Sequence, residues 1–250
     1  MKKIFTLAAI ALFTLASCSD DDATSTTPDT SNVLVKKRID TDEDGEQFIS
    51  TYQYSGNKIA TVDHNDGSNE IYTYTGENLT KVDWYEDGVL VQKDVFTYNS
   101  DNKVATFISY NYNEDPQYNG ADKYTYTYNA NGTVTVVEAY GDHTEQNSIY
   151  QTATATLVNG NLVSYTGSQY SAVYTFDDKN APFKNVQNYQ NYVLSDLEGG
   201  LNNELSYTYT SNGYDENSQY VYEYNEAGFP VKVTETDDFG DVYVTQYIYE

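Results

Sequence analysis

The sequence is poor in the residues on which many enzymes and metal proteins depend. It contains one cysteine, two histidines and one tryptophan in 250 residues. A single thiol allows no intramolecular disulfide, and the sequence has no Cys/His cluster with the spacing of a zinc site. Gly-x-Ser-x-Gly elbows, phosphate-binding glycine-rich loops and dinucleotide fingerprints are also absent. We therefore predict that the protein is not an enzyme and carries no cofactor.

Basic residues are scarce. Lys and Arg number 13 against 38 Asp and Glu, which gives a formal net charge of −25. Nucleic-acid binding needs cations that neutralise phosphates, and docking on anionic lipid needs a basic patch. The charge balance excludes both kinds of partner. It leaves the oligomeric state open.

Only one apolar run stands out, and it is too short to cross a membrane as a helix. The run covers residues 4–16, whereas a spanning helix needs about 20 residues. It follows Lys2 and Lys3, as in a secretory signal, and it ends in Leu-Ala-Ser-Cys at Cys18. This end resembles the lipobox of bacterial lipoproteins. The resemblance implies that residues 1–17 are a signal peptide and that Cys18 carries lipid, the only contact with the membrane.

An acidic run follows the cysteine. It comprises Ser19, Asp20, Asp21 and Asp22, and it resembles the export signal of Bacteroidota lipoproteins. That resemblance implies lipid anchoring in the outer membrane with display on the cell surface. The next ten residues are small and polar, so we interpret residues 18–32 as the lipidated cysteine and a flexible acidic tether.

Residues 33–250 are repetitive and form one predicted domain. The recurring unit is Tyr-x-Tyr, a polar turn and an apolar strand. In residues 124–128, a period of two places three Tyr on one sheet face and two Thr on the other. Six Asp-Gly or Asn-Gly pairs mark hairpin turns. We predict an all-β antiparallel meander of about 14 to 16 strands, curled into a barrel or half-barrel, with one short helix near residues 183–197.

Two family resemblances rest on these hairpins. The segment from Tyr72 to Val82 is similar to the YD repeats of Rhs-type surface proteins, although Asp is mostly replaced after the second aromatic. The length, the lipobox, the hairpins and the segment Phe-Asp-Asp-Lys-Asn-Ala-Pro-Phe (176–183) resemble a Bacteroidota lipoprotein family with a porin-like fold. That resemblance implies a curled β-meander and no particular activity. The face opposite Tyr carries Thr, Glu and Lys, so we do not expect a transmembrane barrel.

One short segment matches the start of a calcium loop. Asp40, Asp42 and Asp44 precede Gly45 with the spacing of ligands 1, 3 and 5. The twelfth position is Thr51 instead of Glu, and the flanks resemble strands. An acidic hairpin turn is therefore the favoured interpretation, and weak calcium binding is the alternative. Both histidines lie beside turn residues, where we expect exposed polar side chains.

The aromatic stripe is the other candidate site. Tyrosine offers a flat apolar face and a hydroxyl group for sugars or peptides. The side chains that we expect to face a ligand are Tyr72, Tyr74, Trp84, Tyr124, Tyr126, Tyr128, Tyr222 and Tyr224.

Three functions are compatible with these features. The first is a surface-displayed, non-enzymatic binding module for a glycan, peptide or lipid. The second is a structural or adhesive module whose tyrosines only stabilise the sheet. The third is a glycoside hydrolase that uses paired carboxylates.

Overall fold

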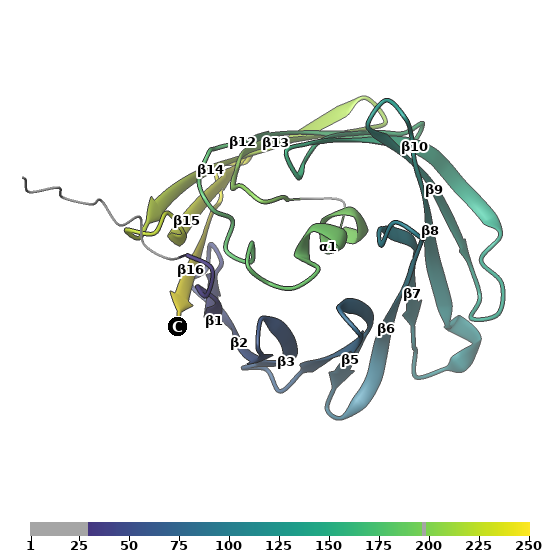
Figure 1. The fold of residues 1–250 in the computed structure, drawn as a ribbon, viewed down its shortest axis with the longest axis horizontal. Coiled ribbons are helices and arrows are strands. Elements are labelled where there is room, and N and C mark those ends of the chain that lie inside the picture. The colour runs from purple at the N-terminus through teal and green to yellow at the C-terminus, as the bar shows by residue number, and fades with distance from the viewer. Residues whose placement is uncertain (1–29, 197–198) are drawn as a thin grey trace, which may run out of the picture.

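A computed structural model describes residues 30–196 and 199–250 as a closed antiparallel barrel (Figure 1). Each strand pairs with its neighbours in the chain, and β1 also pairs with β16. The first eight strands are β1 (Val35–Thr41), β2 (Gln47–Ser55), β3 (Lys58–His64), β4 (Asn69–Thr75), β5 (Asn78–Glu86), β6 (Val89–Tyr98), β7 (Val104–Asn111) and β8 (Gly120–Tyr128). The others are β9 (Thr133–Gly141), β10 (Ser148–Val158), β11 (Asn161–Thr166), β12 (Tyr170–Phe176), β13 (Glu204–Ser211), β14 (Tyr214–Tyr224), β15 (Pro230–Asp237) and β16 (Val242–Tyr249). The helical elements are η1 (Pro116–Tyr118) and α1 (Tyr189–Asp196).

The predicted fold class is confirmed, and the sheet closes fully. Strands β1 and β16 pair in the register Arg38 to Tyr247 and Thr41 to Val244. Closure leaves no unpaired edge, which removes the aggregation hazard of a long open sheet. Sixteen strands lie at the upper end of the predicted number.

The hairpin turns form where the Asp-Gly and Asn-Gly pairs predict them. At Asp87-Gly88, Asn159-Gly160 and Asn212-Gly213 both residues have positive φ, as a two-residue type I′ turn requires. Asn and Gly adopt this conformation at low cost.

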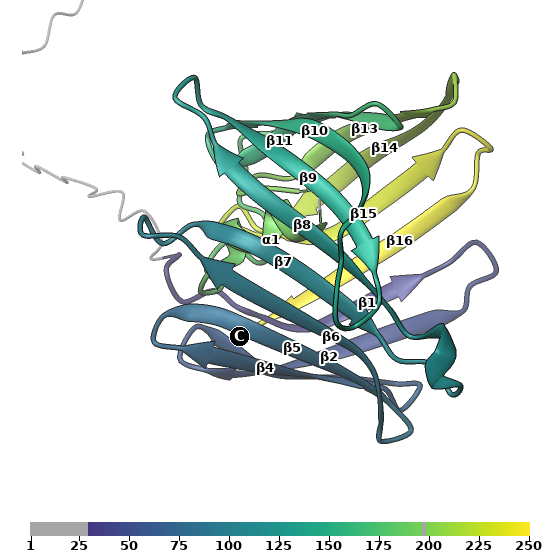
Figure 2. The same cartoon turned by 90° about the vertical axis from the view of Figure 1, so that its right-hand side faces the viewer.

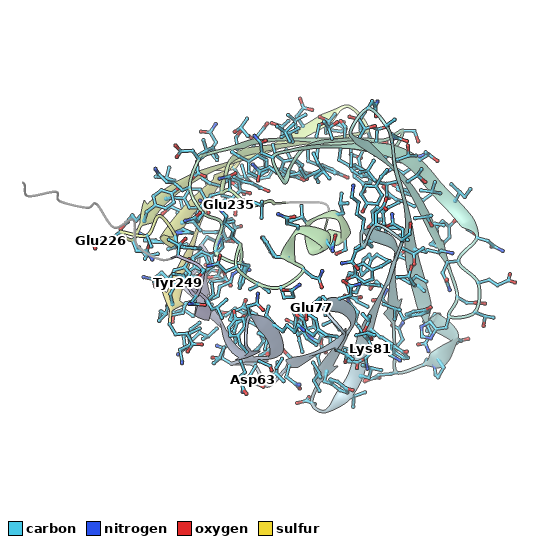
Figure 3. All side chains as sticks on the ribbon, viewed as in Figure 1. Asp63, Glu77, Lys81, Glu226, Glu235 and Tyr249 are labelled. Carbon is cyan, nitrogen blue, oxygen red and sulfur yellow. The ribbon has the colours of Figure 1, made fainter. Side chains whose placement is uncertain are left out.

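The two faces of the sheet differ as the alternation predicts. Tyr126 is 6% exposed and packs in the core, whereas its neighbour Thr127 is exposed. The outer face is less uniformly polar than expected, because Val173, Val221 and Ile248 are exposed there. These apolar residues share the exterior with charged side chains such as Asp63 on β3 (Figure 3). Among the described residues, no helix is long and apolar enough to cross a membrane.

The connection from β12 to β13 enters the barrel instead of forming a hairpin. We call residues 177–203, where described, the plug. Its helix α1 lies inside the ring of strands (Figure 1), and the side view shows α1 behind the wall of β7 and β8 (Figure 2). Backbone hydrogen bonds tie the plug to the β2–β3 turn at Asn57 and to the β14–β15 turn at Gly228. Both turns lie at the end of the barrel where β1 begins and β16 ends, so the plug spans this end.

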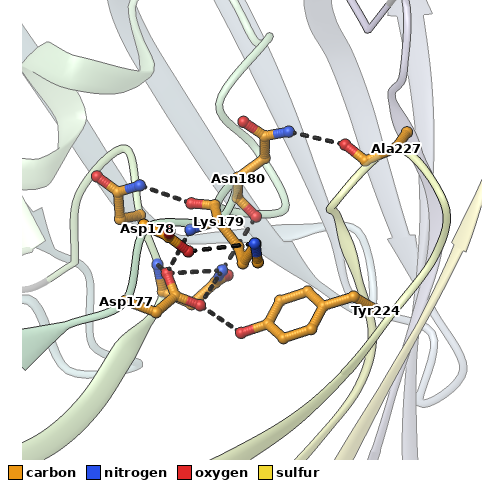
Figure 4. Close-up of polar contacts among 8 residues, drawn as sticks. Asp177, Asp178, Lys179, Asn180, Tyr224 and Ala227 are labelled. Atoms are coloured by element: carbon orange, nitrogen blue, oxygen red, sulfur yellow. Dashed lines mark hydrogen bonds and ion pairs between the residues drawn. The ribbon is translucent and has the colours of Figure 1, made fainter. Parts of the chain in front are cut away.

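Polar contacts fix the start of the plug to the wall (Figure 4). The Asp177 carboxylate accepts hydrogen bonds from the Tyr224 hydroxyl and from the backbone N–H groups of Lys179 and Asn203. The Asn180 amide donates to the Ala227 carbonyl at 3.0 Å. Asp177 and Asn180 belong to the segment 176–183, on which the porin-like resemblance rests.

The helix is shorter than predicted. It begins at Tyr189, and residues 182–188 form turns and bends instead of its first half. Asn188 has a φ of +67°, a left-handed conformation that cannot continue an α-helix. Its side-chain oxygen accepts the Leu79 backbone N–H at 2.9 Å. This hydrogen bond to β5 holds Asn188 outside the helix, so the helix starts only at Tyr189.

Packing joins the plug to one side of the wall. Val193 and Leu194 are 2% and 3% exposed and belong to the same cluster as Phe96 and Leu162. The Tyr126 hydroxyl donates to the Leu194 carbonyl oxygen at 3.0 Å. The barrel core thus consists of the inward face of the strands packed on the plug.

Candidate functional site

The lumen beside the plug is divided into adjoining cavities. A β13–β16 cavity has a volume of about 490 Å³ and a floor at Pro182 and Tyr189. A β1–β5 cavity of about 420 Å³ also contacts Tyr189. A β4–β8 cavity, again of about 420 Å³, shares Glu70 and Trp84 with the second. These volumes suit small ligands or ligand segments.

Carboxylates line the lumen with few cations beside them. Inward-facing acids occur on six strands and at the start of β13, and most accept hydrogen bonds from neutral groups. They are Asp40, Glu70, Asp94, Asp122, Glu138, Glu204 and Glu235. Arg38 is the one Lys or Arg among the described residues that line these cavities, and its Nε donates to Asp40 at 2.9 Å.

Burial shifts the pKa of several side chains that line the lumen. It raises the pKa of Asp94 and of Asp122 above the ordinary value for aspartate. Burial also raises the pKa of Tyr124 to about 12. The phenol therefore stays neutral and serves as a hydrogen-bond donor near neutral pH.

Four residues of the β1–β5 cavity form a chain of hydrogen bonds. The Ser50 hydroxyl lies 3.0 Å from His64 Nδ1, and His64 Nε2 lies 3.2 Å from Glu70 Oε1. The Tyr72 hydroxyl donates to Glu70 Oε2 at 2.6 Å. Because an ionised carboxylate can only accept, His64 Nε2 is assigned the proton and Nδ1 accepts from Ser50.

The His64 ring is held between two aromatic rings. The ring centroids of Phe48 and Trp84 lie 4.9 and 5.5 Å from that of His64, with interplanar angles of 23° and 14°. The His64 side chain is 3% exposed, so the prediction that it is an exposed turn residue is wrong. His143 remains near the surface, where its ring contacts Tyr110 and Tyr112 edge-on.

A second buried carboxylate is held by tyrosines. Glu138 Oε1 accepts hydrogen bonds from Gln151 at 2.7 Å, from Tyr170 at 3.0 Å and from Tyr165. Glu138 is 6% exposed, and burial raises the pKa of Tyr165 and Tyr170. The three side chains that donate to Glu138 are neutral, and the cluster lies across the ring of strands from Ser50.

Five of the eight predicted aromatic side chains line cavities. Tyr72, Tyr74 and Trp84 line the β1–β5 cavity. Tyr124 lines the β4–β8 cavity, and Tyr222 lines the β13–β16 cavity.

The other three tyrosines are engaged in structural contacts. Tyr126 bonds to the plug, and the Tyr128 hydroxyl donates to the Val104 carbonyl at 3.0 Å. Tyr224 holds Asp177 at the start of the plug.

The three aspartates of the calcium-like segment take different positions. Asp40 lies on β1 and pairs with Arg38 inside the lumen. Asp42 Oδ1 accepts the backbone N–H groups of Asp44 and Glu46 at 3.1 and 2.8 Å, which stabilises the turn. Within the described ranges, no three His, Cys, Asp or Glu side chains are grouped so as to hold a metal ion. Calcium binding here remains a prediction.

The predicted targeting residues lie outside the described ranges. These are the signal peptide 1–17, Cys18 and the run Ser19, Asp20, Asp21 and Asp22. Lipidation and surface export therefore remain predictions.

Similar folds occur among solved structures. A porin-like protein from Bacteroides vulgatus has a TM-score of 0.60 and 13% identity, over 87% of this chain and 99% of that one. A porin-like protein from Bacteroides uniformis has 14% identity and a TM-score of 0.37, over 82% and 78%. No family model matches the sequence, and no curated protein does. The first similarity agrees with the expected porin-like barrel, whereas the lipoprotein family and the YD repeats remain resemblances.

Proposed function

We propose that this protein is a lipid-anchored, surface-displayed binding protein of the outer membrane that holds a polar ligand in its lumen. The observation that carries the proposal is the set of adjoining cavities in the lumen: the β1–β5 cavity shares Arg38 with the β13–β16 cavity and shares Glu70 and Trp84 with the β4–β8 cavity. Had the plug and the inward side chains filled the lumen, a purely structural or adhesive module would be favoured. The cavities favour binding instead.

The chemistry of the cavity walls favours a glycan or a peptide over a lipid. Trp84 and Tyr124 supply flat faces for a sugar or peptide unit, and carboxylates such as Asp122 accept hydrogen bonds from hydroxyl or N–H groups. An acyl chain would leave these carboxylates desolvated without a partner, which is costly.

The exterior and the predicted anchor support the location. Charged and threonine side chains interrupt the apolar residues of the outer face, whereas a lipid-embedded barrel needs a continuous apolar band. A lipid on Cys18 would then hold the barrel at the membrane, and the acidic run after it would direct the chain to the cell surface.

Native mass spectrometry of the full chain from a Bacteroidota host, released from detergent, tests the proposal. A panel of neutral oligosaccharides and short peptides is added, with calcium or with chelator. We expect a reproducible adduct that Trp84→Ala abolishes and that Tyr85→Ala retains, because Tyr85 follows Trp84 on β5 and lines none of the cavities. An adduct that survives Trp84→Ala would place binding elsewhere. No adduct from the whole panel would argue for the structural module.

A further inference from the structure

The β1–β5 cavity brings together a hydroxyl group, a base and a carboxylate that no sequence motif predicts. Ser50 and His64 are direct cross-strand partners on β2 and β3, and Glu70 lies on β4 beside them. The two contacts of the imidazole, 3.0 Å to Ser50 and 3.2 Å to Glu70, have the order of nucleophile, base and orienting acid found in serine hydrolases. We propose that Ser50 is a nucleophile, activated by His64, that cleaves carboxylic esters in this cavity.

The hydrogen-bond directions suit this chemistry. Glu70 accepts a hydrogen bond from the Nε2–H of His64, so the lone pair of Nδ1 faces the Ser50 hydroxyl. Tyr72 occupies the other oxygen of Glu70 at 2.6 Å and holds the carboxylate in place. Stacking on Phe48 and Trp84 restricts rotation of the imidazole. Glu70 is thus a positioning residue that stabilises the imidazolium.

A cationic residue lies opposite the nucleophile on the neighbouring strand. Arg38 is the cross-strand partner of Ser50 on the other side, on β1, and lines the same cavity. Directly opposed residues have Cβ atoms about 5 Å apart, within reach of a guanidinium group. In this arrangement Arg38 stabilises the oxyanion that forms when Ser50 attacks.

The reaction needs only ester and water. Ser50 Oγ bonds to the carbonyl carbon while its proton moves to His64 Nδ1. The carbon–alkoxy bond breaks, and the leaving alcohol takes that proton. Water then gives a proton to Nδ1 and attacks the acyl–Ser50 ester, the carbon–Oγ bond breaks, and Ser50 recovers the proton as the carboxylic acid leaves.

The cavity wall indicates the class of substrate. Ser50 and His64 share the cavity with Ile59, Leu79 and the rings of Phe48 and Trp84. With a volume of about 420 Å³, it accepts an ester whose acyl group is a short aliphatic chain or an aromatic ring. This activity goes beyond the proposed binding function and does not depend on it.

A fluorophosphonate probe tests the nucleophile directly. The full chain in detergent is incubated with the probe, and the modified peptide is mapped by mass spectrometry. We expect one probe per chain on Ser50, no labelling in Ser50→Ala, and normal labelling in Ser218→Ala, a lumen serine of the β13–β16 cavity. Labelling elsewhere with Ser50 unmodified, or no labelling at all, overturns the proposal.

The base and the positioning residue have separate readouts. General-base catalysis contributes about 10²–10⁴-fold, so His64→Gln should slow the labelling of Ser50 at least about 100-fold. Glu70→Gln should lower kcat for p-nitrophenyl butyrate at least about tenfold with little change in KM. Thermal melting of each variant verifies folding. A folded His64→Gln variant that labels at the normal rate refutes the role of His64 as base.

Discussion

Replacing Val193 by Ala tests whether the plug is an integral part of the barrel. Val193 lies on α1 and is 2% exposed. The change deletes two buried methyl groups, worth about 0.8 kcal/mol each, and adds a cavity term. The higher helix propensity of Ala returns about 0.5 kcal/mol. The expected net loss in the free energy of unfolding is therefore about 1–3 kcal/mol.

Urea unfolding of the full chain in detergent, followed by the fluorescence of the single tryptophan, measures this loss. Val221→Ala is the matched control, because Val221 on β14 is 70% exposed and should lose less than about 1 kcal/mol. Trp84 lies in the lumen wall, so its signal reports on the barrel and not on the plug alone. Equal losses in the two variants would mean that the plug can detach without weakening the barrel, and would refute the reasoning.

Three further predictions concern a hairpin, a buried acid and the anchor. A Cβ at Gly160 would come within 2.7 Å of the Leu201 side chain in the plug, whereas a Cβ at Gly213 meets nothing within 4 Å, and both glycines have positive φ. Gly160→Ala should therefore lose about 1–3 kcal/mol more unfolding free energy than Gly213→Ala in urea unfolding. Equal losses would contradict the packing of Gly160 on the plug. Burial raises the pKa of Asp94, so the folded state holds this proton more strongly than the unfolded state, and the unmodified chain loses stability as pH rises. Asp94→Asn has no carboxyl group to titrate, so the unfolding free energy of the variant should rise relative to that of the unmodified chain from pH 4 to pH 7. A constant difference would contradict this. Cys18→Ala should move the protein from the membrane to the soluble fraction and abolish incorporation of labelled palmitate, whereas unchanged fractionation would exclude lipidation as the sole anchor.

Local chemistry accounts for the parts of the fold that the sequence predicts. Alternation in residues 124–128 dictates which side chains enter the barrel, and pairs such as Asn212-Gly213 dictate where strands reverse. Both signals lie within a few residues of the structure that they specify. The start of α1 depends instead on the contact between Asn188 and Leu79, which are 109 positions apart. No local pattern contains that information.

The same distinction applies to the lumen. The alternation predicts tyrosines on one face with Glu and Lys on the opposite face, whereas several acids face the lumen in the structure. Ser50, His64 and Glu70 meet only because two hairpins have specific lengths and registers. A shift of one residue in the β2–β3 register would turn His64 to the outer face, with almost no change in the sequence pattern. The turn at Gly56 and the bulge after Gln53 determine how Ser50 and His64 are paired. A search for sequence motifs therefore could not find these three residues. The grouping of Ser50, His64 and Glu70 thus depends on the turns and bulges of the barrel as much as on the residues that face the lumen.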